Sequence, residues 1–318
     1  MNDFECPLCE RELIPLRHQV RDAQTGEAFD IAGCPVCGLG VTAGMPNDLD
    51  QYYGKEYVGR RHGFTASMCD RRRIRIIRGL VQTSAPAKLL DVGCGDGTFL
   101  GTAIQAGYAG IGVERFSSIA ADAGLPVKAS LDETASESPF DIVTMWHVLE
   151  HLPNPGEVTE QLRGQIADNG VLVIAVPDFG SLPSRLVGRF WLHLDVPRHA
   201  YHFTTESLTK LLSDRGFDVE FFRGSEFEYD LLGWSSSAID ALGGEPNLLF
   251  KLLTGRSTKT GRLGRIAALA LGAVLSVLGA VPVLIAGWLG RGGTLIAIAR
   301  PKSANIRVMS EKLEGRIV

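Results

Sequence analysis

The sequence predicts an α/β protein whose core is a Rossmann-like parallel sheet. Apolar runs that suit strands alternate with segments that suit helices, and a glycine-rich turn joins the first strand to the first helix. The runs are nearly continuous, as expected for parallel strands that helices cover on both faces. Core strands are therefore expected at residues 89–92, 109–113, 127–129, 140–145 and 170–176.

The glycine-rich turn follows Asp91 and places glycine at positions 93, 95 and 97. Glycine is favoured where the backbone has a positive φ, or where a ligand lies against the backbone with no Cβ between them. The dinucleotide fingerprint needs its third glycine three residues after the second, where Thr98 stands. The spacing favours a nucleoside cofactor without a diphosphate, and a purely structural turn is the alternative.

The second strand ends in an acid, Glu114, which comes 19 residues after Gly95. A carboxylate at this point can accept hydrogen bonds from two ribose hydroxyls. Together these residues resemble the class I S-adenosylmethionine (SAM)-dependent methyltransferases, whose first motif reads like residues 91–97. The resemblance implies SAM as the cofactor and a seven-stranded sheet, whose last two strands are expected at residues 216–222 and 293–300.

The fourth strand leads into a V-L-E-H-L segment at residues 148–152. It resembles the same segment of the methyltransferase-23-like family, which includes ubiquinone-pathway O-methyltransferases, and this implies that the strand end contacts the methionine part of SAM. Glu150 and His151 could act as a base or hold a divalent metal, and a role at a helix start is the alternative for Glu150. Because ligands of open α/β sheets bind beyond the carboxyl ends of the strands, the loops should converge there. The expected cofactor site comprises Asp91, Gly93, Gly95, Gly97, Glu114, Ser130, Leu131, Trp146 and His147.

Residues 191–204 are dense in polar and aromatic groups and resemble the D-x-P-R-H-x-x-H-F-T stretch of the same family. Methyl transfer needs alignment, exclusion of water and sometimes a proton acceptor, for which a histidine near neutral pKa is suited. In the alternative interpretation, Asp195 and Arg198 pair to brace the loop and the histidines bond to backbone. Tyr53 could line the pocket or simply pack. The expected catalytic residues are His151, His199 and His202, and the expected substrate residues are Tyr53, Asp195 and Arg198.

Two C-P-x-C knuckles near the N-terminus contain four cysteines. Four thiolates suit tetrahedral zinc, each C-x-x-C bends so that both sulfurs point inward, and Gly38 relieves the second turn. Disulfides or a redox pair are the alternative. The sequence therefore predicts a zinc ribbon with a structural Zn²⁺ on Cys6, Cys9, Cys34 and Cys37.

Charge and hydropathy are distributed unevenly along the chain, whose net charge is −4. Residues 256–318 hold ten Lys or Arg against two Glu, whereas residues 266–289 carry no charge. Such a run, taken alone, suits a transmembrane helix. However, the strands expected at residues 216–222 and 293–300 belong to one sheet, so both ends of the run must lie on the same side of the membrane as that sheet. We expect a membrane-associating helical hairpin, bent at Pro282. Helices packed on protein, or a single span, are the alternatives. The small residues Ala268, Gly272, Ser276 and Ala280 form a ridge that lets a second helix approach closely.

The connection before the first core strand includes residues 71–78, which suit a helix packed on one side. Its arginines are expected to form a solvated face, with phosphate binding as the alternative. The expected domains are a zinc ribbon (1–45), a linker with cap helices (46–86), the SAM-binding core (87–223), the apolar insertion (224–292), the last core strand (293–300) and a tail (301–318).

Taken together, the resemblance implies a SAM-dependent methyltransferase of cell-envelope or quinone biosynthesis. Its acceptor is expected to be a small molecule, a glycan or a lipid-linked compound at the cytoplasmic face of the membrane. The polar start predicts no secretory leader, and the acidic body argues against a nucleic-acid partner. The alternatives are an rRNA base methyltransferase with a zinc ribbon, a sugar C-methyltransferase and a non-catalytic SAM-binding scaffold.

Overall fold

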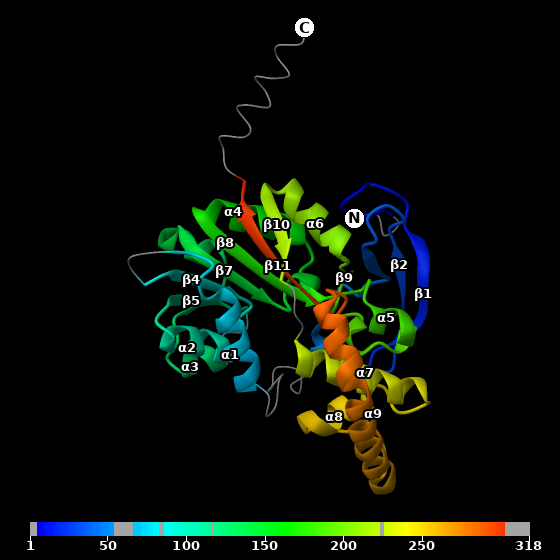
Figure 1. Ribbon diagram of the computed structural model, residues 1–318. Coiled ribbons are helices and arrows are strands. Elements are labelled where there is room, and N and C mark those ends of the chain that lie inside the picture. The colour runs from blue at the N-terminus through cyan, green and yellow to red at the C-terminus, as the bar shows by residue number, and fades with distance from the viewer. Residues whose placement is uncertain (1–4, 54–65, 83–85, 116–117, 223–225, 303–318) are drawn as a thin grey trace.

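The computed structural model describes residues 5–53, 66–82, 86–115, 118–222 and 226–302. Its centre is a seven-stranded sheet with the strand order β10-β11-β8-β7-β4-β5-β6 (Figure 1). Only β11 runs antiparallel to its neighbours, because it pairs antiparallel with both β8 and β10. The predicted fold class is therefore confirmed. The strands are β4 (Lys88–Val92), β5 (Ala109–Val113), β6 (Val127–Lys128), β7 (Phe140–Trp146), β8 (Ile166–Pro177), β10 (Phe217–Phe221) and β11 (Thr294–Pro301).

Helices cover both faces of this sheet, as the continuous apolar strands require. On β4, Leu90 packs in a cluster with residues of α4 and α6, whereas Leu89 packs in a second cluster with residues of α1 and α2. Successive strand residues point to opposite faces, so this alternation places one core on each side. The helices are α1 (Ala66–Ile77), α2 (Thr98–Gln105), α3 (Ser118–Asp122), α4 (Pro155–Gln165) and α6 (Thr205–Asp214).

The N-terminal strands form a second, smaller sheet that a strand from the α/β core completes. It contains β1 (Ile14–Arg21), β2 (Ala28–Gly33) and β3 (Gly40–Ala43), and β3 pairs with β9 (Tyr201–His202) from the polar loop. Thr204 caps α6, and its Oγ1 donates to the carbonyl of Cys37 at 3.2 Å. The ribbon is thus built onto the loop between β8 and α6.

Short helices line the remaining connections. They include α5 (Leu182–Val187) and the 3-10 turns η1 (Asp50–Tyr52), η3 (Asp132–Glu137), η4 (Leu149–His151), η5 (Gly188–Phe190) and η6 (Leu192–Leu194).

The insertion before β11 folds into α7 (Phe227–Ala241), α8 (Leu248–Thr254) and α9 (Arg262–Trp288). Ser235 of α7 bonds to Ser276 of α9 (2.9 Å), and Asp230 bonds to Thr294, just after α9, so the two helices run antiparallel. A Cβ at Gly279 would lie 2.5 Å from Trp234, which shows how closely the helices approach.

The expected bend at Pro282 is wrong, because this proline lies inside the continuous helix α9. The hairpin instead forms between α7 and α9. The predicted ridge of small residues lies on the inner side of α9, where Ala268 and Gly272 are buried.

Candidate functional site

The glycine turn after β4 lies at the carboxyl edge of the sheet. All three glycines have positive φ, as predicted. Gly95 has φ +58, and a Cβ there would meet no atom of the described residues within 4 Å, whereas one at Gly93 or Gly97 would collide with Val148 or Leu125. The space beside Gly95 is therefore bounded by backbone and open to a ligand.

Glu114 lies just after β5 and closes this turn from the neighbouring strand. The N–H of Gly95 donates to Oε2 of Glu114 at 2.9 Å. Asp91 is different, because it is 2% exposed and accepts from Thr144 Oγ1 at 2.7 Å, which ties β4 to β7. Its burial raises the pKa of Asp91 to about 7, and its contacts are structural. The sequence neighbours Ser130 and Leu131 follow β6 and are half-buried, and the Leu131 carbonyl bonds to Gln165.

Trp146 and His147 stand where β7 ends. The indole of Trp146 packs edge-on against Phe99 and under the Arg73 guanidinium, and its Nε1 is buried without a hydrogen-bond partner. His147 has φ +56, a rare backbone conformation for a residue with a side chain. Its Nε2 donates to Glu226 at 2.6 Å.

Glu226 pairs with basic side chains from two other parts of the chain. Its side chain is fully buried, and it pairs with Arg72 (3.0 Å) and Arg73 (3.3 Å) of α1 as well as with His147. The expectation of a solvated arginine face is therefore wrong for Arg72 and Arg73. A buried carboxylate needs compensating charge, which these arginines supply from the start of the core.

A cavity of about 480 Å³ opens beside Trp146 and His147. The ribbon lines it with Asp22, Gln24 and other residues of the turn between β1 and β2. The insertion supplies the opposite wall, where Glu245 organises the turn by accepting from Lys251 and Thr260. The core contributes Trp146, His147, His151, Leu192, His193, Asp195, Arg198 and His199, and the insertion contributes Tyr229, Phe250, Lys251, Arg256 and residues 257–259.

Three residues beside the cavity form a compact group, and two of them, His151 and His199, line the cavity. The ligand atoms of Glu150, His151 and His199 lie within 4.8 Å of one another, so together they could hold a divalent metal. Both carboxylate oxygens of Glu150 are buried without a hydrogen-bond partner. Burial alone would raise the pKa of Glu150, but His147, His199 and His151 lower it to about 2. Glu150 does not cap α4, whose N-cap is Asn154.

His199 has a defined tautomer, because its Nδ1 donates to the carbonyl of His193 at 3.0 Å. Its Nε2 lies 3.9 Å from both Glu150 and Asp195. Burial lowers the pKa of His199, so the ring is neutral near pH 7 and Nε2 carries a lone pair. A proton acceptor therefore faces the cavity.

The other predicted residues divide between the cavity and the scaffold. Arg198 bonds to Asp195 (2.6 Å), Asp22 (2.7 Å) and the carbonyl of Tyr52, so its contacts brace the loop. His202 is buried, and its Nε2 donates to Thr42 at 3.0 Å. His202 does not line the cavity.

Tyr53 follows η1 in the linker that precedes the core. Its hydroxyl is 3.2 Å from Nδ1 of His151, which also donates to the Arg198 carbonyl at 3.1 Å. Tyr53 therefore reaches the histidine cluster, although it is not among the cavity-lining residues.

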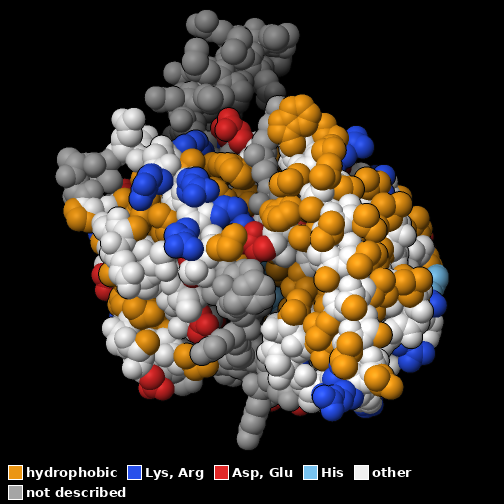
Figure 2. Space-filling view, turned by 60° about the horizontal axis from the view of Figure 1, so that its bottom comes forward, with side chains coloured by type: hydrophobic (Ala, Val, Ile, Leu, Met, Phe, Trp, Pro, Cys, Tyr) orange, Lys and Arg blue, Asp and Glu red, His pale blue; other side chains and the backbone are white. Residues whose placement is uncertain are grey.

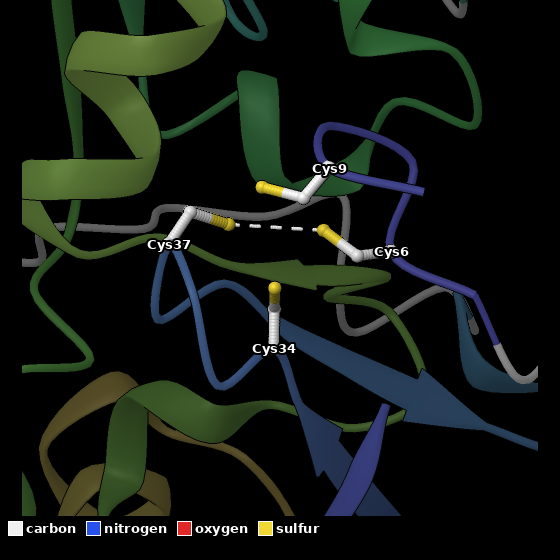
Figure 3. Close-up of side chains that lie close together, drawn as sticks. All are labelled: Cys6, Cys9, Cys34 and Cys37. Atoms are coloured by element: carbon white, nitrogen blue, oxygen red, sulfur yellow. Dashed lines mark hydrogen bonds between the residues drawn. The ribbon is translucent and has the colours of Figure 1, made fainter. Parts of the chain in front are cut away.

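The four cysteines of the knuckles meet at the base of the ribbon, with their sulfurs pointing toward one another (Figure 3). The sulfurs of Cys6 and Cys37 are 3.7 Å apart, and all four lie within 4.8 Å of one another. All are free thiols, which excludes disulfides in this structure. A tetrahedral zinc site with bonds of about 2.3 Å separates its sulfurs by about 3.8 Å, so this arrangement fits zinc.

Comparison with known families identifies the core. Residues 67–220 match the family described as a methyltransferase domain. This segment of the chain is a domain of that methyltransferase family. The matched segment runs from α1 to β10 and contains the glycine turn, Glu114 and the histidine-rich loop.

Several solved structures resemble the chain. A SAM-dependent methyltransferase from Archaeoglobus fulgidus is 21% identical, with 80% of this chain and 100% of that one covered and a TM-score of 0.45. Mycolic acid cyclopropane synthase CmaA1, complexed with SAH and CTAB, is 13% identical, with 79% and 93% covered and a TM-score of 0.46. A putative sarcosine dimethylglycine methyltransferase from Galdieria sulphuraria is 15% identical, with 75% and 86% covered and a TM-score of 0.44. A comparison with curated proteins gives no match.

Several residues around the methyltransferase site carried no signal in the sequence. Glu226 and Tyr229 come from the insertion, and Tyr229 stacks on His193 with ring centres 4.2 Å apart. The ribbon turn at Asp22 reaches the cavity through Arg198. These placements depend on contacts between distant segments, which no local pattern indicates.

The charge cluster beside the methyltransferase site predicts how stability depends on pH. Burial alone would lower the pKa of His147, but Glu150 and Glu226 raise it to about 9. A histidine whose pKa is higher in the folded than in the unfolded protein stabilises the fold while it is protonated. This stability is complete below the unfolded pKa of about 6.5 and is lost as pH rises through the folded pKa of about 9. We expect the free energy of unfolding in urea to fall by about 1–3 kcal/mol between pH 6.5 and pH 9.5.

The matched variant is His147→Gln, which keeps a donor at this position but cannot titrate. Its stability should start lower at pH 6.5 and fall less over the same range. Parallel pH curves for the two proteins would show that His147 does not supply this dependence.

Proposed function

We propose that the protein transfers a methyl group from SAM to an acceptor bound in the cavity beside Trp146 and His147. The observation that carries this proposal is the open space at Gly95, which the carboxylate of Glu114 closes from the next strand. The turn lies at the same edge of the sheet as the cavity beside Trp146 and His147, because β4 and β7 are parallel neighbours. His199 lines that cavity, and residues 67–220 match a methyltransferase family.

The residues of the turn fit the nucleoside part of SAM. Gly95 leaves its outer side bare, so the ligand can lie against the backbone. Glu114 follows β5 at the same edge of the sheet, where a carboxylate can accept from ribose hydroxyls. When bound, SAM supplies a methyl group that its positively charged sulfur activates. The chain itself has to orient the acceptor and exclude water.

Proton transfer is the step for which the cavity has a suitable side chain. An acceptor hydroxyl or protonated amine loses a proton when it becomes methylated. His199 holds its own proton on Nδ1, so Nε2 can take the acceptor's proton. Asp195 and Glu150 lie 3.9 Å from Nε2 and stabilise the imidazolium that forms.

The cysteine cluster is proposed to hold one structural Zn²⁺. Its four sulfurs have the spacing that tetrahedral zinc requires, and the ribbon contributes Asp22 to the bracing of the cavity loop. Zinc would thus stabilise the ribbon wall and take no part in chemistry.

The first test is the substitution Gly95→Ala, which places a methyl group in the proposed SAM space. Within the part of the chain that the structure describes, no atom lies within 4 Å of that group, so the fold should persist. We expect calorimetry to show at least a tenfold loss of SAM affinity. Gly107→Ala is the matched control, because Gly107 also has positive φ and open space but lies at the far end of α2. Equal SAM affinity in both variants would contradict the proposed cofactor site.

The second test separates the two histidines of the polar loop. His199→Asn should lower methyl transfer from labelled SAM to a cell extract by about 100-fold, the usual contribution of a general base, and leave SAM affinity unchanged. His202→Gln should retain transfer per folded molecule, because His202 does not line the cavity.

Full transfer by His199→Asn would rule out the proton-acceptor role. Loss of transfer on chelation, with activity restored by a divalent metal, would assign the Glu150 cluster to metal binding. SAM binding with no transfer to any extract would favour the non-catalytic scaffold.

The third test concerns the metal. Elemental analysis of purified protein should find one zinc per chain, and Cys34→Ser should lose it together with some thermal stability. Cys69→Ser is the control, since Cys69 is remote from the cluster and bonds to Glu228. Absence of zinc from the wild-type protein would refute this site.

A further inference from the structure

Helix α9 presents a long apolar face that the rest of the chain leaves uncovered. The helix has 27 residues, which span about 40 Å. Large apolar side chains recur along it at helical spacing, and Leu263, Val277 and Trp288 are 83%, 75% and 78% exposed. In Figure 2, hydrophobic side chains gather over the right half of the molecule as drawn. Exposed apolar patches of this extent mark interaction surfaces.

The inner face of α9 already has its partners. Gly272 faces Leu249 of α8, and Gly279 faces Trp234 of α7. Only 22% of the most apolar 18-residue window is buried. The small residues of α9 therefore serve the fold, whereas most of its large apolar residues are exposed and Val283 is the buried exception among the described residues.

The exposed charges that flank α9 along the chain are positive, and the nearby carboxylate of Glu245 is already bonded to Lys251 and Thr260. Between Pro246 and Arg300 the sequence contains seven Lys or Arg and no acid. Lys259 and Arg262 are exposed at the start of α9, and Arg291 is exposed just after its end. The partner should thus be apolar along its middle and anionic at its edges.

Both ends of α9 are tied to the same side of the molecule. Residues 257–259 line the cavity together with Asp22 and His199, and β11 follows the helix into the sheet. Although α9 is long and apolar enough to cross a membrane, it cannot do so without removing one of these ends from the body.

We propose that the outer face of α9 lies in the surface of an anionic lipid bilayer, and that the cavity takes its acceptor from that bilayer. A second copy of the chain fits this face less well, since either a parallel or an antiparallel pairing of two α9 helices would place cationic ends together. Anionic lipid supplies both the apolar layer and the neutralising charge.

The second part of the proposal rests on the proposed methyl transfer. The cavity wall that precedes α9 contains Phe250, whose ring lies 4.9 Å from the Arg256 guanidinium, and the exposed Lys259. This wall combines an apolar ring with positive charge beside the membrane face. It fits an amphiphile with an anionic group and an apolar chain.

The test is sedimentation of the full-length protein with vesicles of phosphatidylcholine alone or with one third phosphatidylglycerol. We expect binding at least tenfold tighter to the anionic vesicles. The double variant Val277→Glu with Leu278→Glu should lose binding to both, because these side chains face outward. Arg262→Glu should weaken only the binding to anionic vesicles. Ile14→Glu, at a residue of β1 that is 50% exposed, is the matched control and should bind normally.

Unchanged vesicle binding by the double variant would overturn the proposal. A wild-type dimer that the double variant converts to a monomer, with no vesicle binding, would assign the face to a second copy and overturn it too. SAM affinity is measured on the same samples, so a failure of membrane binding is distinguishable from a failure of the proposed function.

The acceptor is tested with labelled methyl-SAM and isolated membranes. Label should enter the fraction extracted by organic solvent, and this transfer should fall in the double variant. Label found only in water-soluble products would refute a bilayer acceptor while leaving methyl transfer intact.

Discussion

The buried carboxylate of Glu226 is the interaction on which the arrangement of the site depends. It stands at the start of the insertion and has no exposure to solvent, so it needs positive partners. Two arginines of α1 and the strained His147 at the end of β7 provide them. Removing one partner would leave uncompensated charge in the interior. The cluster therefore fixes the insertion, the first helix and the catalytic edge of the sheet relative to one another.

The cavity follows from this constraint because its walls come from three separate parts of the chain. The core provides the histidines, the ribbon provides the turn at Asp22, and the insertion provides the wall organised by Glu245. Arg198 joins the first two parts through its pairing with Asp22. The inserted segment and the four-cysteine ribbon thus shape the cavity proposed for the acceptor, and neither contributes residues to the glycine turn.

Much of the fold could be predicted from local sequence patterns. The continuous apolar strands and the glycine turn each depend on neighbouring residues, and the structure confirms them. Contacts between distant segments could not be predicted in this way. Arginine is usually found at the surface, yet Arg73 is buried, where it pairs with Glu226. Pro282 lies inside α9, a helix that packs against α7 and α8. His202 occurs in the same motif as His199, yet pairing of β9 with β3 turns it into the scaffold.

A crystal structure of the protein with S-adenosylhomocysteine bound tests the central claim most directly. Methyl transfer into the cavity requires that the ribose bind to Glu114 and that the nucleoside lie against the bare backbone of Gly95. It also requires that the sulfur point toward the cavity beside Trp146 and His199. Electron density that places the ligand in this orientation would support methyl transfer into the cavity. A ligand bound elsewhere, or one whose sulfur points away from the cavity, would contradict it.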